Sequence, residues 1–203
     1  MNLWRSILDQ GGYTATKGIV GVDPGGTTGI FSVIVSENAE GDTGTLTSWT
    51  QVTRDAEVTI GYMLLTMKEC GIPANRLNVA IEKYIITQRT AKLTRQPAAL
   101  EVTGEVKAVA RRHNARVWEF TASNAKKFAS DELLERVGWI GRGRSQRHAR
   151  DAARQTWSCL AEVDFPAWEA TWENQVWTVD GDEVIEVSMD EIMRAGGMDD
   201  DLD

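Results

Sequence analysis

Two acidic residues each directly follow a short apolar run that is typical of a buried strand. Asp23 follows Ile19-Val20-Gly21-Val22, and Glu82 follows Val79-Ala80-Ile81. If the two strands are neighbours in one sheet, both carboxylates emerge at the same edge, where they repel each other unless a cation lies between them. Mg²⁺ prefers oxygen ligands and is commonly held by one or two carboxylates together with substrate phosphates. The pair therefore predicts a magnesium site at a sheet edge.

A histidine and a further aspartate lie together later in the chain. His148 and Asp151 are three residues apart, so they share one face of a predicted helix that begins at a Ser145 cap and runs to about Ala161. Docked against the sheet edge, this face would complete a site for two metal ions. Because imidazole suits Mn²⁺ better than Mg²⁺, His148 is either a ligand or a group that orients or deprotonates water.

Each of these residues also has a plain structural interpretation. Asp23 begins an Asp-Pro-Gly turn and can simply cap it, and Glu82 can be an exposed strand end. His148 and Asp151 can belong to a solvated helix face that is rich in arginine. The metal site is favoured because it explains the strand-end acids and the helix pair together.

The intervening sequence predicts an α/β fold with a mixed five-stranded sheet flanked by helices. The expected strands are 18–22, 30–35, 45–53, 77–81 and 115–120. The expected helices are 56–70, a long one around 98–110, 123–128, 131–137 and 145–161. The first two strands are joined by a turn rich in Gly and Pro, which indicates a hairpin.

Two of these helices carry apolar residues at helical spacing, which indicates a helix in each case and an apolar stripe along the long helix. In helix 56–70 the spaced residues are Val58, Tyr62, Leu65 and Met67. In the long helix they form the stripe Ala98, Ala99, Val102, Val106, Val109 and Ala110.

Charge divides the chain into two unlike parts. The 203 residues have a net charge of −8, but residues 1–161 carry +5 and residues 162–203 carry −13. We therefore expect a domain over 1–161 and an acidic, Trp-containing C-terminal extension over 162–203 that is partly disordered, with a hairpin at 177–187. The asymmetry is typical of a nucleic-acid-binding body with an acidic tail. The tail either weakens non-specific DNA binding by mimicking phosphate charge or only adds solubility.

The remaining composition predicts a cytoplasmic protein. No apolar run approaches the roughly 18–20 residues of a membrane span, and the N-terminus lacks the pattern of a signal peptide. Cys70 and Cys159 have no metal-type spacing, so we expect two reduced core thiols.

Three motifs in this order resemble the RuvC-type Holliday junction resolvases, particularly their bacteriophage branch. The motifs are Gly21-Val22-Asp23-Pro24-Gly25-Gly26-Thr27-Thr28-Gly29, Ala80-Ile81-Glu82-Lys83 and His148-Ala149-Arg150-Asp151-Ala152. The resemblance covers roughly residues 18–160 and implies a ribonuclease-H-like fold. If the chain is phage-encoded, its compartment would be the host cell cytoplasm.

The resemblance implies a structure-specific endonuclease that resolves four-way DNA junctions by two-metal-ion hydrolysis. It places the catalytic metal ligands at Asp23, Glu82, His148 and Asp151, with Mg²⁺ as cofactor and Mn²⁺ as a substitute. Asp23 would bridge the two ions. It also implies a homodimer that is formed through the helix around Ala98–Ala110. The preference among junctions, flaps and forks stays open.

DNA contacts require basic or aromatic residues near the same edge. The candidates are Lys83, Tyr84, Arg89, Lys126, Lys127, Arg142, Arg144 and Arg147.

Two other functions compete. The Asp23–Gly29 turn also resembles the first phosphate loop of sugar kinases and actin-like ATPases, where glycine amides and a threonine hydroxyl hold nucleotide phosphates. That fold needs a second such loop, which this sequence lacks, and it leaves His148 and Asp151 unexplained. The chain can also be a non-catalytic module that binds branched DNA, although all four ligand positions are filled.

Overall fold

The computed structural model describes residues 3–84, 96–140, 146–171, 176–180 and 183–187. In chain order the elements are α1 (Leu3–Gln10), β1 (Thr14–Asp23), β2 (Thr28–Glu37), β3 (Thr43–Val52), α2 (Ala56–Glu69), the 3₁₀ turn η1 (Ala74–Arg76), β4 (Leu77–Glu82), α3 (Gln96–Arg112), β5 (Arg116–Phe120), α4 (Ala122–Phe128), α5 (Asp131–Arg136), α6 (Arg147–Val163), α7 (Phe165–Ala170), β6 (Val176–Asp180) and β7 (Glu183–Val187). The predicted elements over 18–161 are all present, and β1 begins four residues earlier than expected.

One mixed sheet runs through the molecule in the order β5-β4-β1-β2-β3-β6-β7. β1, β2 and β3 form an antiparallel meander, whereas β4 and β5 run parallel to β1 and to each other. This order and direction of the first five strands confirm the predicted ribonuclease-H-like fold. The sheet is larger than predicted, because the hairpin β6–β7 pairs parallel to the edge strand β3 and extends it to seven strands.

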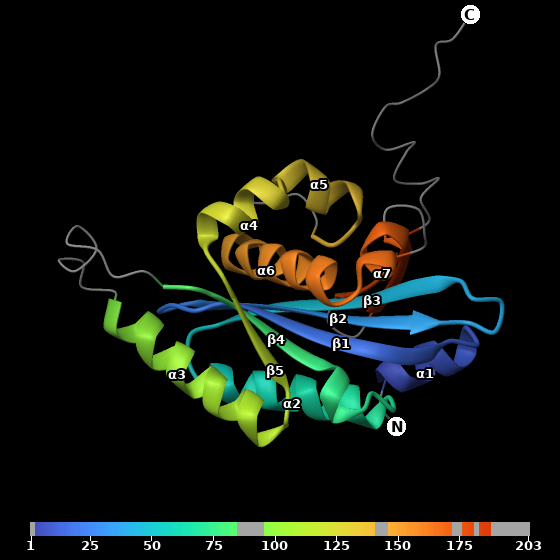
Figure 1. Cartoon of the computed structure of the whole chain (residues 1–203), viewed down its shortest axis with the longest axis horizontal. Coiled ribbons are helices and arrows are strands. Elements are labelled where there is room, and N and C mark those ends of the chain that lie inside the picture. The colour runs from blue at the N-terminus through green and yellow to red at the C-terminus, as the bar shows by residue number, and fades with distance from the viewer. Residues whose placement is uncertain (1–2, 85–95, 141–145, 172–175, 181–182, 188–203) are drawn as a thin grey trace, which may run out of the picture.

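Helices cover both faces of the sheet (Figure 1). α1, α2 and α3 lie on one face, and α4, α5, α6 and α7 lie on the other. Successive side chains of β1 point to opposite faces of the sheet. Val20 packs in the core under α2 and α3, and Ile19 packs in the core under α6. The second core contains Phe31, Trp139 and Trp157, whose rings stack or meet edge to face.

The helix predicted over 56–70 is present as α2, but of the four spaced apolar residues only Met67 is fully buried. Val58, Tyr62 and Leu65 are 64%, 69% and 48% exposed, whereas Ile60 and Leu64 are fully buried. α2 carries apolar residues around most of its circumference, so spacing alone allowed two choices of buried face. The helix therefore presents an apolar stripe to solvent.

The stripe of the long helix is mainly a core feature. Val106 and Ala110 are fully buried and Ala99 and Val109 nearly so, within the core that α3 shares with α2 and the sheet. This side of α3 is consequently unavailable for a partner subunit. The homodimer predicted through the helix around Ala98–Ala110 stays a prediction, since the opposite side of α3 is exposed at Gly104 and Ala108.

The C-terminal extension begins as part of the same folded body. α6 crosses the expected boundary at 161 and ends at Val163. Asp164 then caps α7, and its carboxylate pairs with Lys17 on β1 at 2.6 Å. Of the predicted hairpin, both strands are present, while its turn at 181–182, the Ser145 cap and the tail from 188 lie outside the described residues. Gln146 occupies the N-cap of α6.

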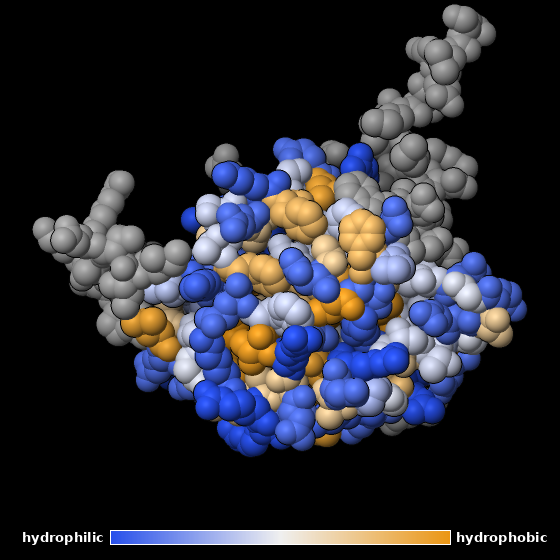
Figure 2. Space-filling model, viewed as in Figure 1, coloured by the Kyte–Doolittle hydropathy of each residue, from blue (hydrophilic) through white to orange (hydrophobic). Residues whose placement is uncertain are grey.

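The face of the molecule in Figure 2 is mainly hydrophilic, with apolar side chains scattered over it. Among the described residues, no helix is long and apolar enough to cross a membrane. Cys70 and Cys159 are both buried and free, as predicted.

Candidate metal centre at the sheet edge

The parallel pairing of β1 and β4 brings the two strand-end acids together. Val22 is in register with Ile81, so Asp23 and Glu82 follow side by side at the same edge of the sheet. Burial raises the pKa of Asp23 above its usual value, and the Asp151 carboxylate adds to this. Burial, together with the Asp23 and Asp151 carboxylates, raises the pKa of Glu82 to about 7. Three carboxylates therefore share one electrostatic environment.

α6 delivers the other two candidates because glycines let it approach the sheet closely. A Cβ atom at Gly29 on β2 would overlap the backbone carbonyl of His148, and one at Gly21 on β1 would overlap the Ala152 carbonyl oxygen. The backbone N–H of His148 donates to the Gln51 side chain on β3 at 3.0 Å. Sequence reasoning missed Gln51, because nothing in its neighbourhood indicates that a helix from residue 147 docks there.

His148 and Asp23 are in direct contact. The His148 Nδ1 and Asp23 Oδ2 atoms are 2.7 Å apart. This bond moderates the raised pKa of Asp23, since it favours the charged carboxylate. Asp23 is thus the central member of the group, with His148 on one side and Glu82 on the other.

Asp151 is the most enclosed of the candidates after α6 docks. The residue is 8% exposed, and its carboxylate accepts a hydrogen bond from the Arg154 guanidinium. Lys126 on α4 approaches the same carboxylate, with its Nζ atom 3.4 Å from Asp151 Oδ1. Sequence analysis identified Asp151 and Lys126, but gave Arg154 no role.

The donor set suits Mg²⁺ or Mn²⁺, since it consists of three carboxylates and one imidazole. Across the described ranges, however, no three His, Cys, Asp or Glu side chains are already arranged around a common ion position. Asp23 is engaged by His148 and Asp151 by Arg154. The backbone therefore brings the four residues together, and a common ion position for all four would require some of their side chains, such as the Asp23–His148 pair, to rotate, while Arg154 engages Asp151 through its Oδ1 atom.

The predicted DNA contacts distribute unevenly. Lys126 and Lys127 are exposed near the end of α4, and Arg147 is exposed at the start of α6. Lys83 is exposed directly after Glu82, and Tyr84 is partly buried. The remaining three candidates, Arg89, Arg142 and Arg144, lie outside the described residues.

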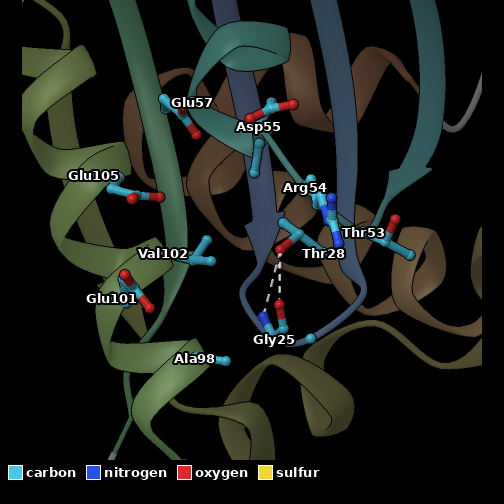
Figure 3. A pocket seen from close by; sticks show the side chains of 12 residues that line it. Gly25, Thr28, Thr53, Arg54, Asp55, Glu57, Ala98, Glu101, Val102 and Glu105 are labelled. Atoms are coloured by element: carbon cyan, nitrogen blue, oxygen red, sulfur yellow. Dashed lines mark hydrogen bonds between the residues drawn. The ribbon is translucent and has the colours of Figure 1, made fainter.

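A cleft of about 310 Å³ lies beside the β1–β2 turn, between the N-terminal parts of α2 and α3 (Figure 3). Four acidic residues line it, Asp55, Glu57, Glu101 and Glu105, with Arg54 as the basic residue among the lining. The Thr28 hydroxyl donates to the Gly25 carbonyl at 3.2 Å. A phosphate loop would turn this hydroxyl toward a nucleotide, and the surrounding carboxylates would repel phosphates. The cleft therefore disfavours the kinase-like interpretation.

No protein-family model matches the sequence, and no curated protein matches it. Among solved structures, the chain is similar to Thermus thermophilus RuvC, with 18% identity, a TM-score of 0.48, and coverage of 71% of this chain and 95% of that one. It is likewise similar to T. thermophilus RuvC in complex with a Holliday junction substrate, with 16% identity, a TM-score of 0.49, and coverage of 72% and 96%.

Proposed function

We propose that this chain is a metal-dependent endonuclease of the RuvC resolvase type that cuts branched DNA, with four-way junctions as the main substrate. The observation that supports this most directly is the convergence of Asp23, Glu82, His148 and Asp151 at one sheet edge from three separate elements. A turn-capping role for Asp23 or a solvated face for Asp151 would not require this burial.

We assign a catalytic role to each of the four residues from its position in the group. Bound Mg²⁺ or Mn²⁺ would activate a water and stabilise the leaving 3′ oxygen. Asp23, at the centre of the group, would hold the metal together with Glu82 and Asp151. His148, whose side chain is 41% exposed and is fixed by Asp23, would complete a ligand set or orient and deprotonate the attacking water.

The distribution of charge suggests a path for DNA. Lys126, Lys127 and Arg147 lie on the α4–α6 side of the site, whereas the cleft on the α2–α3 side is acidic. Phosphate contacts favour the basic side and make affinity fall with salt. We therefore expect a DNA arm to cross the site over α4 and the start of α6.

A four-way junction has two-fold symmetry, so we further propose that the protein acts as a homodimer with matching two-fold symmetry. The outer surface of α2 and α3 suits this role. Val58, Tyr62 and Leu65 supply an exposed apolar stripe, and Gly104 and Ala108 on α3 are small and exposed.

Charge on this surface is self-complementary. Acidic residues gather where α2 and α3 begin, around the cleft of Glu57 and Glu105. Lys68 and Arg112 gather at the opposite ends of both helices, where together with burial they lower the pKa of His113. An antiparallel copy would place each acidic end against a basic end, as an isologous interface requires.

The decisive experiment is cleavage of labelled four-way junction, flap and linear duplex with Mg²⁺ or Mn²⁺. We expect paired nicks near the junction centre that fall at least about a hundredfold in Asp23→Asn, with binding largely kept. Asp9→Asn, an exposed aspartate on α1 that pairs with Arg5, is the matched control and should cleave normally.

Undiminished cleavage by Asp23→Asn would refute the site assignment. Junction binding by the wild type without cleavage under any metal condition would instead indicate the non-catalytic module. Tight ATP binding without nuclease activity would favour the kinase-like protein.

A further inference from the structure

Arg154 is a buried cation whose donors reach three different parts of the α4–α6 layer. Its Nε atom donates to the Ala129 carbonyl at 3.0 Å, and its two terminal nitrogens donate to Asp151 and Asp131. Asp151 lies one turn earlier on α6, Ala129 is the C-cap of α4, and Asp131 begins α5. One guanidinium thereby joins the helix of the metal centre to the two helices that cover it.

This arrangement fixes the guanidinium. The Arg154 side chain is only 10% exposed, so its charge is held away from water and depends on its protein acceptors. Arginine stays charged and presents its donors in a rigid planar fork, so acceptors on separate elements also fix its orientation. Asp151 is consequently held in one orientation, close enough to Asp23 and Glu82 that its charge raises the pKa of both carboxyls.

Lys126 and Arg154 both contact Asp151, but they differ in whether they can leave it to contact DNA. The Lys126 side chain is 49% exposed and lies on the side where DNA is expected, so a phosphate can draw it away. Arg154 is 8% exposed as a residue and cannot reach a DNA strand over the site. Arg154 is therefore the partner that remains with Asp151 after substrate binds.

We propose that Arg154 is a positioning residue for the metal centre: it orients Asp151 for the ion and holds the Lys126-bearing helix against α6. The inference rests on the function proposed above. Hydrogen-bonding partners behind a metal ligand set its orientation, and losing one typically costs about 10–100-fold in metal affinity or activity. The effect of Arg154 should accordingly appear in the metal requirement, with the KM for DNA almost unchanged.

The test compares three variants with the wild type in two titrations. Arg154→Met removes the guanidinium, Arg154→Lys keeps a charge but cannot satisfy three acceptors at once, and Arg150→Met is the matched control. Arg150 is a partly buried arginine one turn earlier on α6, with a 13% exposed side chain that pairs with Asp131 and Glu135. Junction cleavage is measured against Mn²⁺ and Mg²⁺ concentration, and Mn²⁺ binding without DNA is measured by calorimetry. Thermal melts report the stability of each variant.

We expect Arg154→Met to raise the half-saturating metal concentration by about tenfold or more in both titrations, with a smaller rise in Arg154→Lys. Arg150→Met should melt earlier than the wild type but keep the wild-type metal requirement. If Arg154→Met melts earlier with an unchanged metal requirement, or if both methionine variants raise it equally, Arg154 is merely structural and the proposal is overturned. If Arg154→Met does not fold, Arg154→Lys decides by the same criterion.

Asp23→Asn separates this inference from the proposed function. If Asp23→Asn binds Mn²⁺ and cleaves like the wild type, the metal centre itself is wrong. If Asp23→Asn loses Mn²⁺ binding and cleavage while Arg154→Met retains wild-type Mn²⁺ binding and cleavage, only the role of Arg154 is refuted.

Discussion

Glu82 carries a raised pKa because the fold places its carboxylate beside two others in a half-buried edge. The pKa is about 7, with burial as the first cause and the Asp23 and Asp151 carboxylates as the next. Near neutral pH the group is therefore divided between its protonated and its charged form. A divalent cation favours the charged form, so metal binding should strengthen as pH rises through 7.

The raised pKa predicts how metal-free stability depends on pH. The folded state binds the Glu82 proton more tightly than the unfolded state, so this contribution is full below about pH 4.5 and is lost as pH rises through 7. After allowance for solvent screening it is on the order of 2 kcal/mol. Metal-free Glu82→Gln should therefore gain in Tm relative to the wild type between pH 5 and pH 8, and saturating Mg²⁺ should reverse the order.

The control is Glu37→Gln, an exposed glutamate at the far end of β2. Its Tm difference from the wild type should stay nearly constant with pH. A Tm difference for Glu82→Gln that is equally constant between pH 5 and pH 8 would show that the pKa of Glu82 is not raised in the folded protein.

Local sequence patterns predict some residues of the site and not others. Asp23 and Glu82 directly follow apolar runs, and His148 and Asp151 share a helix face, so local patterns were enough to nominate all four. Gln51 and Arg154 were not found in the same way. Their roles depend on contacts between elements that are 97 residues apart for Gln51 and 23 and 25 apart for Arg154.

At the scale of elements, the site depends on how closely α6 lies against β1 and β2. Gly29 is paired with Asp23 across the hairpin, directly beneath the His148 backbone. Gly29→Ala should push the first turn of α6 away from the sheet, because the added methyl meets backbone rather than a flexible side chain. We expect a loss of about 1–3 kcal/mol in stability and a larger loss of cleavage than of junction binding.

Gly26→Ala is the matched control, since a Cβ atom there has no neighbour within 4 Å among the described residues. Chemical denaturation and single-turnover cleavage of both variants provide the comparison. Wild-type stability and activity in Gly29→Ala would show that α6 docks less closely than described.

At this scale, the sequence predicts that a helix is present more reliably than it predicts which side of the helix is buried. The helices over 56–70 and around 98–110 were predicted, but the buried side of α2 was not, because α2 is apolar around most of its surface. α3 has a narrower apolar stripe, most of which is buried. The hairpin β6–β7 was also predicted, yet its pairing with β3 is a long-range contact that no local pattern indicates.

At the scale of the whole molecule, the two helical layers serve different partners in our proposal. The α4–α7 layer carries α6 and the basic residues Lys126, Lys127 and Arg147 beside the proposed metal centre. The α2–α3 layer carries an apolar stripe with acidic and basic ends. In an antiparallel dimer the two metal centres would be separated by roughly the length of α2 or more, about 20 Å, and related by the two-fold axis.

This arrangement predicts the effect of a charge at the centre of the stripe. Tyr62 is 69% exposed and lies between Val58 and Leu65 on α2. Tyr62→Glu should weaken dimerisation at least about thirtyfold, as expected for a buried interface tyrosine, and should abolish paired nicking while single nicks persist. Phe165→Glu, at a 56% exposed aromatic residue on α7, is the control and should leave the dimer intact.

Charge reversal then tests the orientation of the two subunits. Glu105→Lys alone should weaken the dimer, because the acidic end of one α2–α3 layer would meet the basic end of the other with like charge. Adding Arg112→Glu should restore it, since the double change exchanges the two charges across the interface. Sedimentation equilibrium gives each dissociation constant. A wild-type protein that remains monomeric at tens of micromolar would contradict the proposed dimer. A dimer that is equally stable in Tyr62→Glu would show that α2 does not form the interface. Failure of the double change to restore association would exclude the antiparallel orientation.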